Sequence, residues 1–377
     1  MKTAIKGVML AVTAALTLGI AGYSQGDAGI AMAKTTTHAR AASKAKSTAV
    51  VKLQETGSTL LFPLFQLWAP AYRKVAPSVE LTPNGTGSGV GIAQASAGVV
   101  QIGASDAYMS NEQLMKSPGM LNIPMAISAQ QIMYKIPGVP AKDHLHLTGN
   151  VIAQIFLGKI GYWNAPQIQD LNKGIKLPHM AITPIHRHDG SGDTFLFTQF
   201  MTDTNAQWAK TVMYGTSVSW PTVRGALDAV GNQGVVQVAE RTPGSIAYVG
   251  ISWLNKALSG GMGEAMLQNR AGHFLLPTEQ TIAAAAKVMI GATPKDERIS
   301  LIYAPGANSY PIINYEYAII NEKQSGATTA AAVKSLLLWA ISPMGGNKQS
   351  FMSQVHFLPL PPSIYPLSKA QIDEIHA

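Results

Sequence analysis

The sequence is organised around residues 186–200, HRHDGSGDTFLFTQF. Three small residues, Gly190, Ser191 and Gly192, precede a run whose apolar positions form one face at helical spacing. A helix that begins there has backbone N–H groups without helical partners, and its dipole adds positive potential at the same end. Arg187 supplies a planar fork that can donate to two oxygens of a phosphate or carboxylate. These residues predict an oxyanion pocket, with phosphate as the leading candidate.

Two further loops of small residues open predicted helices earlier in the chain. Residues 55–59 (ETGST) offer good N-cap chemistry before an amphipathic pattern, and residues 84–89 (NGTGSG) lead into a second helix. Asp106 follows residues 99–105, a run typical of a buried strand. A carboxylate at the C-terminal end of a strand lies where α/β sheets bind ligands, or else it caps the next segment.

The loops do not match the common nucleotide-binding or hydrolase motifs. Ile160 stands where a P-loop requires Ser or Thr, and Asp189 stands where a nucleophile elbow requires Gly. The histidines near the third loop lack a carboxylate or cysteine partner set, so a solvated loop is expected rather than a metal site. These histidines are His179, His186 and His188. We therefore predict a binding protein with no catalytic residue, no metal and no cofactor.

Short β-rich runs alternate with helical patterns along the chain, which predicts an α/β fold. The predicted strands are residues 99–104, 131–136, 181–186, 245–249 and 312–320. About 325 residues remain after the N-terminal region, which is long for one hydrophobic core and indicates two domains.

The N-terminal region has the pattern of an export signal. Lys2 and Lys6 precede an uncharged, mostly apolar stretch at 7–22, and Ala31-Met32-Ala33 fits a cleavage site, so residues 1–33 are predicted to be a signal peptide. The alternative is a membrane anchor, for which sixteen residues are short. Because the chain has no cysteine, it has no site for an N-terminal lipid anchor or a disulfide. We expect a soluble protein in a periplasm.

Most of the positive charge lies outside the predicted folded region. Residues 34–50 are small, polar and basic, and we interpret them as a disordered linker. The chain carries +8, but removal of residues 1–33 leaves +7, and four of these charges lie in the linker. The remainder carries about +3 and shows no basic stripe interleaved with aromatic residues. We therefore expect no nucleic-acid partner.

Taken together, these segments resemble the periplasmic phosphate-binding proteins of Pst-type ABC transporters. The similarity extends from about Thr56 to Tyr365. It includes the loops at 57–59 and 84–89, Gly103-Ala104-Ser105-Asp106, and residues 187–192. Three segments outside the candidate pocket also follow the family pattern: residues 147–164, 231–250 and 309–312.

The resemblance implies a two-lobed clamshell that binds one inorganic phosphate in the cleft between the lobes. Lobe I would comprise residues 51–125 and 306–377, and lobe II residues 126–305. Hinges are expected near 121–130 and 300–311. The implied partners are the transmembrane permease subunits of a phosphate ABC transporter, and the protein is expected to be a monomer.

The resemblance also implies the phosphate contacts. These would be the Thr59 hydroxyl, the Leu60 backbone, Ser88, Asp106, Arg187, Ser191 and Gly192, with Asp189 orienting Arg187. Leu60 replaces the commoner Phe, which is mild because the backbone N–H makes the contact. Asp193 replaces the usual Thr and places a possible negative charge beside an anion. We expect its side chain to point outward and complement the helix dipole. The alternative is a second acceptor inside the cleft.

Other functions are compatible with parts of this pattern. A receptor for sulfate or arsenate would use a similar pocket. A secreted phosphatase or other hydrolase would need a metal or an activated nucleophile, and neither the histidines nor Ser191 offers the required partners. A phosphate-sensing or surface-adhesion role is a further alternative.

Overall fold

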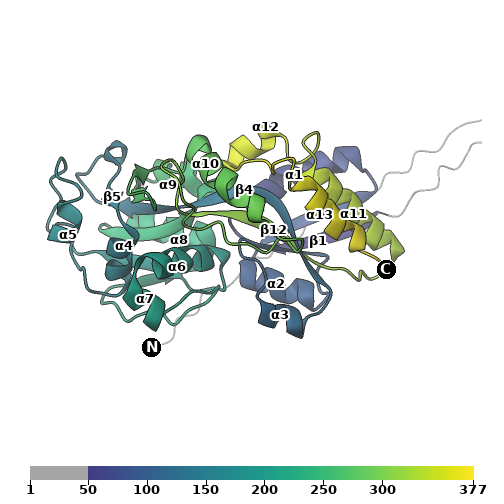
Figure 1. Ribbon diagram of the computed structural model, residues 1–377, viewed down its shortest axis with the longest axis horizontal. Helices are drawn as coiled ribbons and strands as arrows, with labels where there is room; N and C mark the ends of the chain where they lie inside the picture. The colour runs from purple at the N-terminus through teal and green to yellow at the C-terminus, as the bar shows by residue number, and fades with distance from the viewer. Residues whose placement is uncertain (1–49) are drawn as a thin grey trace, which may run out of the picture. The chain divides into compact units, whose positions relative to one another are not determined.

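A computed structural model describes residues 50–377. The predicted signal peptide and all but the last residue of the predicted linker lie outside the described residues. Within the described range, strands and helices alternate along most of the chain, as the sequence predicts (Figure 1). No helix in this range is long and apolar enough to cross a membrane.

The strands are β1 (Val51–Gly57), β2 (Val79–Gly85), β3 (Ile102–Ser105), β4 (Met120–Lys135), β5 (His146–Leu147), β6 (Thr183–Arg187), β7 (Leu227–Ala229), β8 (Ser245–Gly250), β9 (Gly263–Glu264), β10 (Met266–Gln268), β11 (Phe274–Leu275) and β12 (Ile313–Asn321). The α-helices are α1 (Phe62–Val75), α2 (Ser88–Ser96), α3 (Asn111–Lys116), α4 (Gly149–Phe156), α5 (Pro166–Gln169), α6 (Gly192–Thr204), α7 (Ala206–Thr211), α8 (Gly231–Arg241), α9 (Leu254–Ser259), α10 (Glu279–Met289), α11 (Ala327–Ile341), α12 (Gln349–Met352) and α13 (Tyr365–Glu374). Short 3-10 helices are η1 (Ala141–Asp143), η2 (Ile251–Trp253), η3 (Ile290–Ala292) and η4 (Ser353–Val355).

One long strand, β4, connects the two halves of the main sheet. Within residues 50–377 this sheet has the order β2-β1-β3-β12-β4-β8-β6-β7, with β9 paired to β4. Residues 120–129 of β4 pair with β12, and residues 130–135 pair with β8. The strand is buried at every position except the last, which is only partly exposed, so its sequence lacks polar alternation.

Two groups of parallel strands flank the antiparallel pair of β4 and β12. The first group is β1, β2 and β3, and the second is β6, β7 and β8. Figure 1 shows α1, α11 and α13 beside the first group and α4, α6, α7 and α8 beside the second. This arrangement is the predicted two-lobed α/β fold. The residue limits of the lobes and the position of the hinges stay predictions.

The helices that lead to the candidate site are anchored by large buried side chains. Leu64, Phe65, Trp68 and Tyr72 form the buried face of α1, which matches the amphipathic pattern in the sequence. In α6, Phe197 and Phe200 are fully buried. Phe197 stacks on Tyr248 of β8, with ring centroids 4.3 Å apart. Packing of this kind fixes the first turns of both helices, where the small-residue loops enter.

Candidate functional site: a buried arginine among carboxylates

The three small-residue loops lie next to one another in the structure. The backbone N–H of Gly89 donates to the carbonyl of Gly190 at 2.9 Å. An added Cβ on Gly192 would lie 2.5 Å from the Cβ of Asp106, so only glycine permits this approach. The loop before α1 joins them through Ser58, whose hydroxyl donates to Asp106 Oδ1. Segments far apart in the sequence therefore meet at Asp106.

The loop before α6 has the predicted helix-initiating geometry. Ser191 is the N-cap residue, and its Oγ accepts from the backbone N–H of Thr194 at 3.3 Å. The backbone N–H of Ser191 donates to the carbonyl of Thr216 at 2.8 Å. Ser191 is fully buried, which places the positive end of the helix dipole in the protein interior.

Arg187, the last residue of β6, is held by two carboxylates. Its Nε donates to Asp189 Oδ1 at 2.7 Å, and its Nη2 donates to Asp189 Oδ2. Its Nη1 donates to Asp193 Oδ2 at 2.8 Å. Only 3% of Arg187 is exposed. Burial alone would lower the pKa of Arg187, but the two aspartates outweigh burial and raise it, so the guanidinium stays charged.

Asp193 points into this cluster, so the expectation of an outward side chain is wrong. It is 1% exposed. Its Oδ1 accepts from Gln130 Nε2 at 3.1 Å, and its Oδ2 accepts from Asn232 Nδ2 at 2.7 Å. Arg187 and these two amides donate the hydrogen bonds that water would donate to an exposed carboxylate. The buried position therefore becomes favourable, although the helix dipole alone would favour an exposed acid equally well. Burial nevertheless raises the pKa of Asp193, and Arg187 only partly offsets this.

Thr59, in the loop before α1, and Ser88, the first residue of α2, contribute hydroxyl groups. The Oγ1 of Thr59 accepts from Asn232 twice, from its backbone N–H at 3.1 Å and from Nδ2 at 3.0 Å. The backbone N–H of Leu60 donates to Ser58 Oγ at 3.1 Å. The Oγ of Ser88 accepts from the backbone N–H of Asp106 at 3.2 Å and lies 3.3 Å from Asp106 Oδ2.

Asp106 is the acceptor at the centre of these loops. It is 2% exposed and follows β3, as the sequence predicts. Burial and the charge of Asp193 raise the pKa of Asp106 to about 7, while contacts with Glu316, Ser58 and Arg187 act in the opposite direction. The group can therefore change between acceptor and donor near neutral pH.

The structure brings all of the sequence-predicted site residues together. These are Thr59, Leu60, Ser88, Asp106, Arg187, Ser191 and Gly192, with Asp189 and Asp193. The sequence did not identify Ser58, Gln130, Asn232, Tyr248 or Glu316 as part of the site. Ser58, Asn232 and Tyr248 lie inside segments that follow the family pattern, so that pattern could have indicated them. Gln130 and Glu316 carry no comparable signal, because they lie within strands far from the loops.

The histidines noted in the sequence do not gather into a cluster. His186 stacks on Trp220 and His179 stacks on Tyr162. His188 Nδ1 lies 3.1 Å from a carboxylate oxygen of Asp228 on the surface. Within residues 50–377, no three acidic or histidine side chains are arranged to hold a metal ion.

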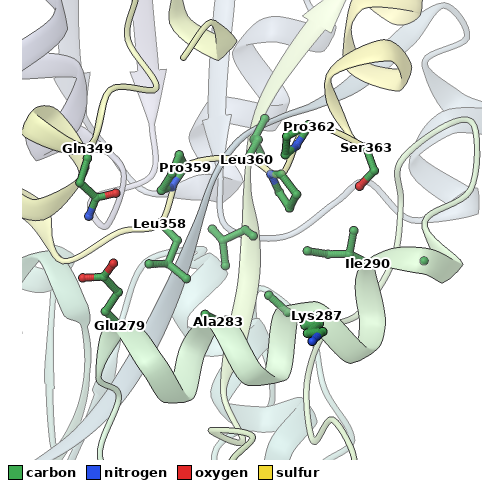
Figure 2. A pocket seen from close by; sticks show the side chains of 14 residues that line it. Glu279, Ala283, Lys287, Ile290, Gln349, Leu358, Pro359, Leu360, Pro362 and Ser363 are labelled. Atoms are coloured by element: carbon green, nitrogen blue, oxygen red, sulfur yellow. The ribbon is translucent and has the colours of Figure 1, made fainter. Parts of the chain in front are cut away.

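A separate cavity of about 550 Å³ lies between α10 and the proline-rich segment 358–363 (Figure 2). Ala283, Ile290 and Leu358 give it an apolar lining, and Glu279 and Lys287 lie on its wall. None of the predicted site residues lines this cavity. Its apolar character does not suit a small tetrahedral anion.

Comparisons with known proteins place the chain in a family. A family model described as PBP superfamily domain matches residues 42–344. A protein named phosphate-binding protein PstS from Xylella fastidiosa (strain Temecula1) is 33% identical over 321 residues, which cover 85% of this chain and 84% of that protein. A protein of the same name from Methanocaldococcus jannaschii is 34% identical over 310 residues, covering 77% and 78%. The chain therefore belongs to the PBP superfamily and, within it, to the family of PstS phosphate-binding proteins.

Solved structures agree on the fold. A crystal structure of a phosphate-binding protein from Stenotrophomonas maltophilia superimposes with a TM-score of 0.62 and 18% identity, covering 85% of this chain and 94% of that chain. A structure titled as a high affinity periplasmic phosphate-binding protein bound with phosphate gives a TM-score of 0.66 at 19% identity, covering 85% and 93%. At these identities, the likeness supports the two-lobed fold.

Proposed function

We propose that this protein captures one inorganic phosphate between its lobes and delivers it to the permease subunits of an ABC transporter. The observation that carries the proposal is a buried cation, Arg187, and a buried acid, Asp106, which both lie at the N-terminus of α6. Asp193 in the first turn of α6 pairs with Arg187, and Gly192 in the same turn packs against Asp106. An anion that still carries a proton satisfies both groups, because it can accept from Arg187 and donate to Asp106.

The proposed contacts are the same residues that the sequence predicts. The hydroxyl groups of Thr59, Ser88 and Ser191, the backbone N–H groups of Leu60 and Gly192, and the guanidinium of Arg187 would donate to phosphate oxygens. Asp106 would accept a hydrogen bond from an O–H group of the ligand. Asp189 would hold Arg187 in place through its two hydrogen bonds.

The carboxylates determine which oxyanion fits. An ionised carboxylate can only accept hydrogen bonds, so an anion without a proton is repelled and leaves a buried group unpaired. Sulfate carries no proton near neutral pH, whereas phosphate and arsenate do. The site is therefore expected to reject sulfate by roughly 10⁴–10⁵-fold, the range reached by sites built to hydrogen-bond a ligand group. Asp106 does not separate arsenate from phosphate.

Asp193 adds a second possible acceptor. Its Oδ2 already accepts from Arg187 and Asn232, so its charge is partly satisfied without a ligand. Each carboxylate that contacts a phosphate oxygen needs one proton between the two oxygen atoms. A phosphate that contacts both Asp106 and Asp193 therefore needs two protons, which are shared among the ligand and the two carboxyl groups. We therefore propose that the site prefers the singly charged form of phosphate, H₂PO₄⁻, and binds most tightly below neutral pH.

The family supports the transport role. Its curated relatives are named phosphate-binding proteins, and one structure with the same fold is titled as a substrate-binding protein of a phosphate ABC transporter. We propose a periplasmic location, reached through the N-terminal signal peptide, and a monomeric protein without catalytic activity. The contact of the Ser191 hydroxyl supports the absence of catalysis. Its Oγ caps α6 by accepting from the N–H of Thr194, and this contact does not activate Ser191 as a nucleophile.

Titration calorimetry of the purified protein with phosphate, arsenate and sulfate tests this proposal. The expected result is one phosphate per chain, comparable arsenate binding, and sulfate binding that is weaker by roughly 10⁴–10⁵-fold. Tight sulfate binding would overturn the role of Asp106, and hydrolysis of phosphate esters by the same preparation would favour the hydrolase alternative.

A further inference from the structure

Glu316 is a fully buried acid that lies opposite Asp106 in the main sheet and is not among the proposed ligand contacts. Glu316 lies on β12, which pairs with β3 in antiparallel fashion. Tyr317 pairs with Ser105, so Glu316, one residue earlier on β12, lies opposite Asp106, which follows β3. On the other side of β12, Pro124 of β4 cannot donate to the ladder, and the register shifts between Glu316 and Tyr317. A bulge of this kind re-aims a side chain.

The hydrogen bonds of Glu316 satisfy only one of its two oxygens. Oε1 accepts from Asn314 Nδ2 at 3.0 Å and lies 2.5 Å from Ser128 Oγ. Oε2 is buried and has no donor. The amide of Asn314 also donates to the backbone carbonyl of Asp106 at 3.2 Å, which keeps the two acids side by side. An ionised Glu316 would leave a buried charged oxygen without a partner, which is costly.

A neutral Glu316 satisfies every part of this arrangement. A proton on Oε2 converts the unpaired acceptor into a donor, and Asp106 is the titratable residue opposite Glu316 where β3 and β12 pair. Burial and the charge of Asp106 both raise the pKa of Glu316 well above its ordinary value. Asp193 and Arg187 act on Asp106 from the other lobe, and the remaining groups around Glu316, Ser128 and Asn314, do not titrate.

We propose that Glu316 is a specificity-determining residue that, as a neutral acid, donates a hydrogen bond to Asp106 and so keeps Asp106 an ionised acceptor for the proton of the ligand. This inference rests on the proposed phosphate-binding function. According to this inference, a residue of β12 contributes to the discrimination between phosphate and sulfate, in addition to the residues of the binding loops. Glu316 acts through Asp106 and does not touch the ligand.

The consequence can be measured as a selectivity ratio. Without the hydrogen bond from Glu316, burial and Asp193 would raise the pKa of Asp106 further, and Asp106 would be protonated at neutral pH. A protonated Asp106 is a donor, which suits sulfate better and phosphate worse. A shift of one pKa unit corresponds to about a tenfold change in the ratio of phosphate to sulfate affinity.

The test compares two variants with the native protein, using calorimetry with inorganic phosphate and with sulfate between about pH 5.5 and 8.5. Glu316→Met keeps the length of the side chain and removes the donor. Glu316→Gln restores a donor, because its Nε2 can replace the O–H while its Oε1 accepts from Asn314 and Ser128. Glu297→Gln is the matched control: Glu297 is a buried acid bonded to Ser368 and Gln371, outside the site. Thermal melting establishes that each variant is folded.

Glu316→Met is expected to lower the phosphate-to-sulfate ratio at pH 7.5 at least tenfold, while Glu316→Gln and the control retain the native pH profile. An unchanged ratio in Glu316→Met overturns the inference and leaves the proposed function standing. If Glu316→Met does not fold, the pH profile of Glu316→Gln is compared with that of the native protein, and this comparison tests the inference. A shift of its pH profile by one unit or more would mean that Glu316 is ionised and the inference wrong. A native protein that binds no phosphate overturns the proposed function and this inference together.

Discussion

Replacement of Asp193 by asparagine is expected to change how phosphate affinity depends on pH. The carboxylate of Asp193 is buried beside Arg187, with Gln130 and Asn232 as its other donors. Asparagine has the same shape, so its Oδ1 can still accept from Arg187 and Asn232. The substitution removes one negative charge and one demand for a proton from the proposed binding site.

The magnitude follows from counting protons in the complex. With Asp106 and Asp193 both facing the ligand, two protons are required, and above neutral pH one of them must be taken up from solution. Affinity should then fall about tenfold for each pH unit, or about 100-fold between pH 7 and pH 9. In Asp193→Asn, one proton is sufficient, and phosphate keeps that proton throughout the range. The affinity of the variant should change less than about threefold over the same interval.

Calorimetry at several pH values, in two buffers with different ionisation enthalpies, measures both the affinity and the number of protons taken up. Asp203→Asn, at the exposed C-terminal end of the same helix, is the matched control and should behave like the native protein. Parallel pH profiles for the native protein and Asp193→Asn, with equal proton uptake, would refute the reasoning and show that Asp193 only supports Arg187.

Three further predictions concern charge, stability and motion. Arg187→Ala should weaken phosphate binding by about 2–5 kcal/mol, and Arg187→Lys should recover only part of this because the planar fork is lost; near-native affinity in Arg187→Ala would exclude it from the site. Burial raises the pKa of Glu297 from 4.5 to about 8, so the unfolded state ionises first and the free energy of unfolding should fall as pH rises through this window. Glu297→Gln should flatten this decline in thermal melts, and equal slopes would contradict it. Phosphate should reduce the radius of gyration in small-angle scattering, because a ligand that touches both lobes favours closure; an unchanged radius at saturation would argue against a site between the lobes.

The loops and their helices could be predicted from sequence because local chemistry determines them. Ser191 caps α6 by accepting from the backbone N–H of Thr194, which is only three residues further along the chain. The strands at 131–136, 181–186, 245–249 and 312–320 could also be predicted, since each is short and rich in β-branched, aromatic and other apolar residues. The strand β2 was not predicted, because it contains a proline and ends in residues 84–85, which the sequence assigns to a loop of small residues. In the predicted strand at 99–104, only the part from Ile102 is extended.

The inward orientation of Asp193 depends on tertiary structure. A first-turn acid on a helix is ordinarily solvated, and no local pattern distinguishes this one. The side chain of Asp193 is held by Arg187 and by the amides of Gln130 on β4 and Asn232 on α8. The two amides are about 60 and 40 residues away from Asp193 in sequence. Glu316 is a similar case, because Asp106, its proposed partner, follows a strand more than 200 residues earlier. Long-range pairing of this kind leaves no signature in a single sequence.

A crystal structure of the protein grown with phosphate tests the central claim most directly. We expect one tetrahedral anion enclosed by Thr59, Ser88, Ser191 and Arg187, with one of its oxygens within hydrogen-bonding distance of Asp106. Phosphate bound elsewhere, or a structure in which Arg187 and Asp106 remain out of contact with the anion at saturating phosphate, would contradict the account.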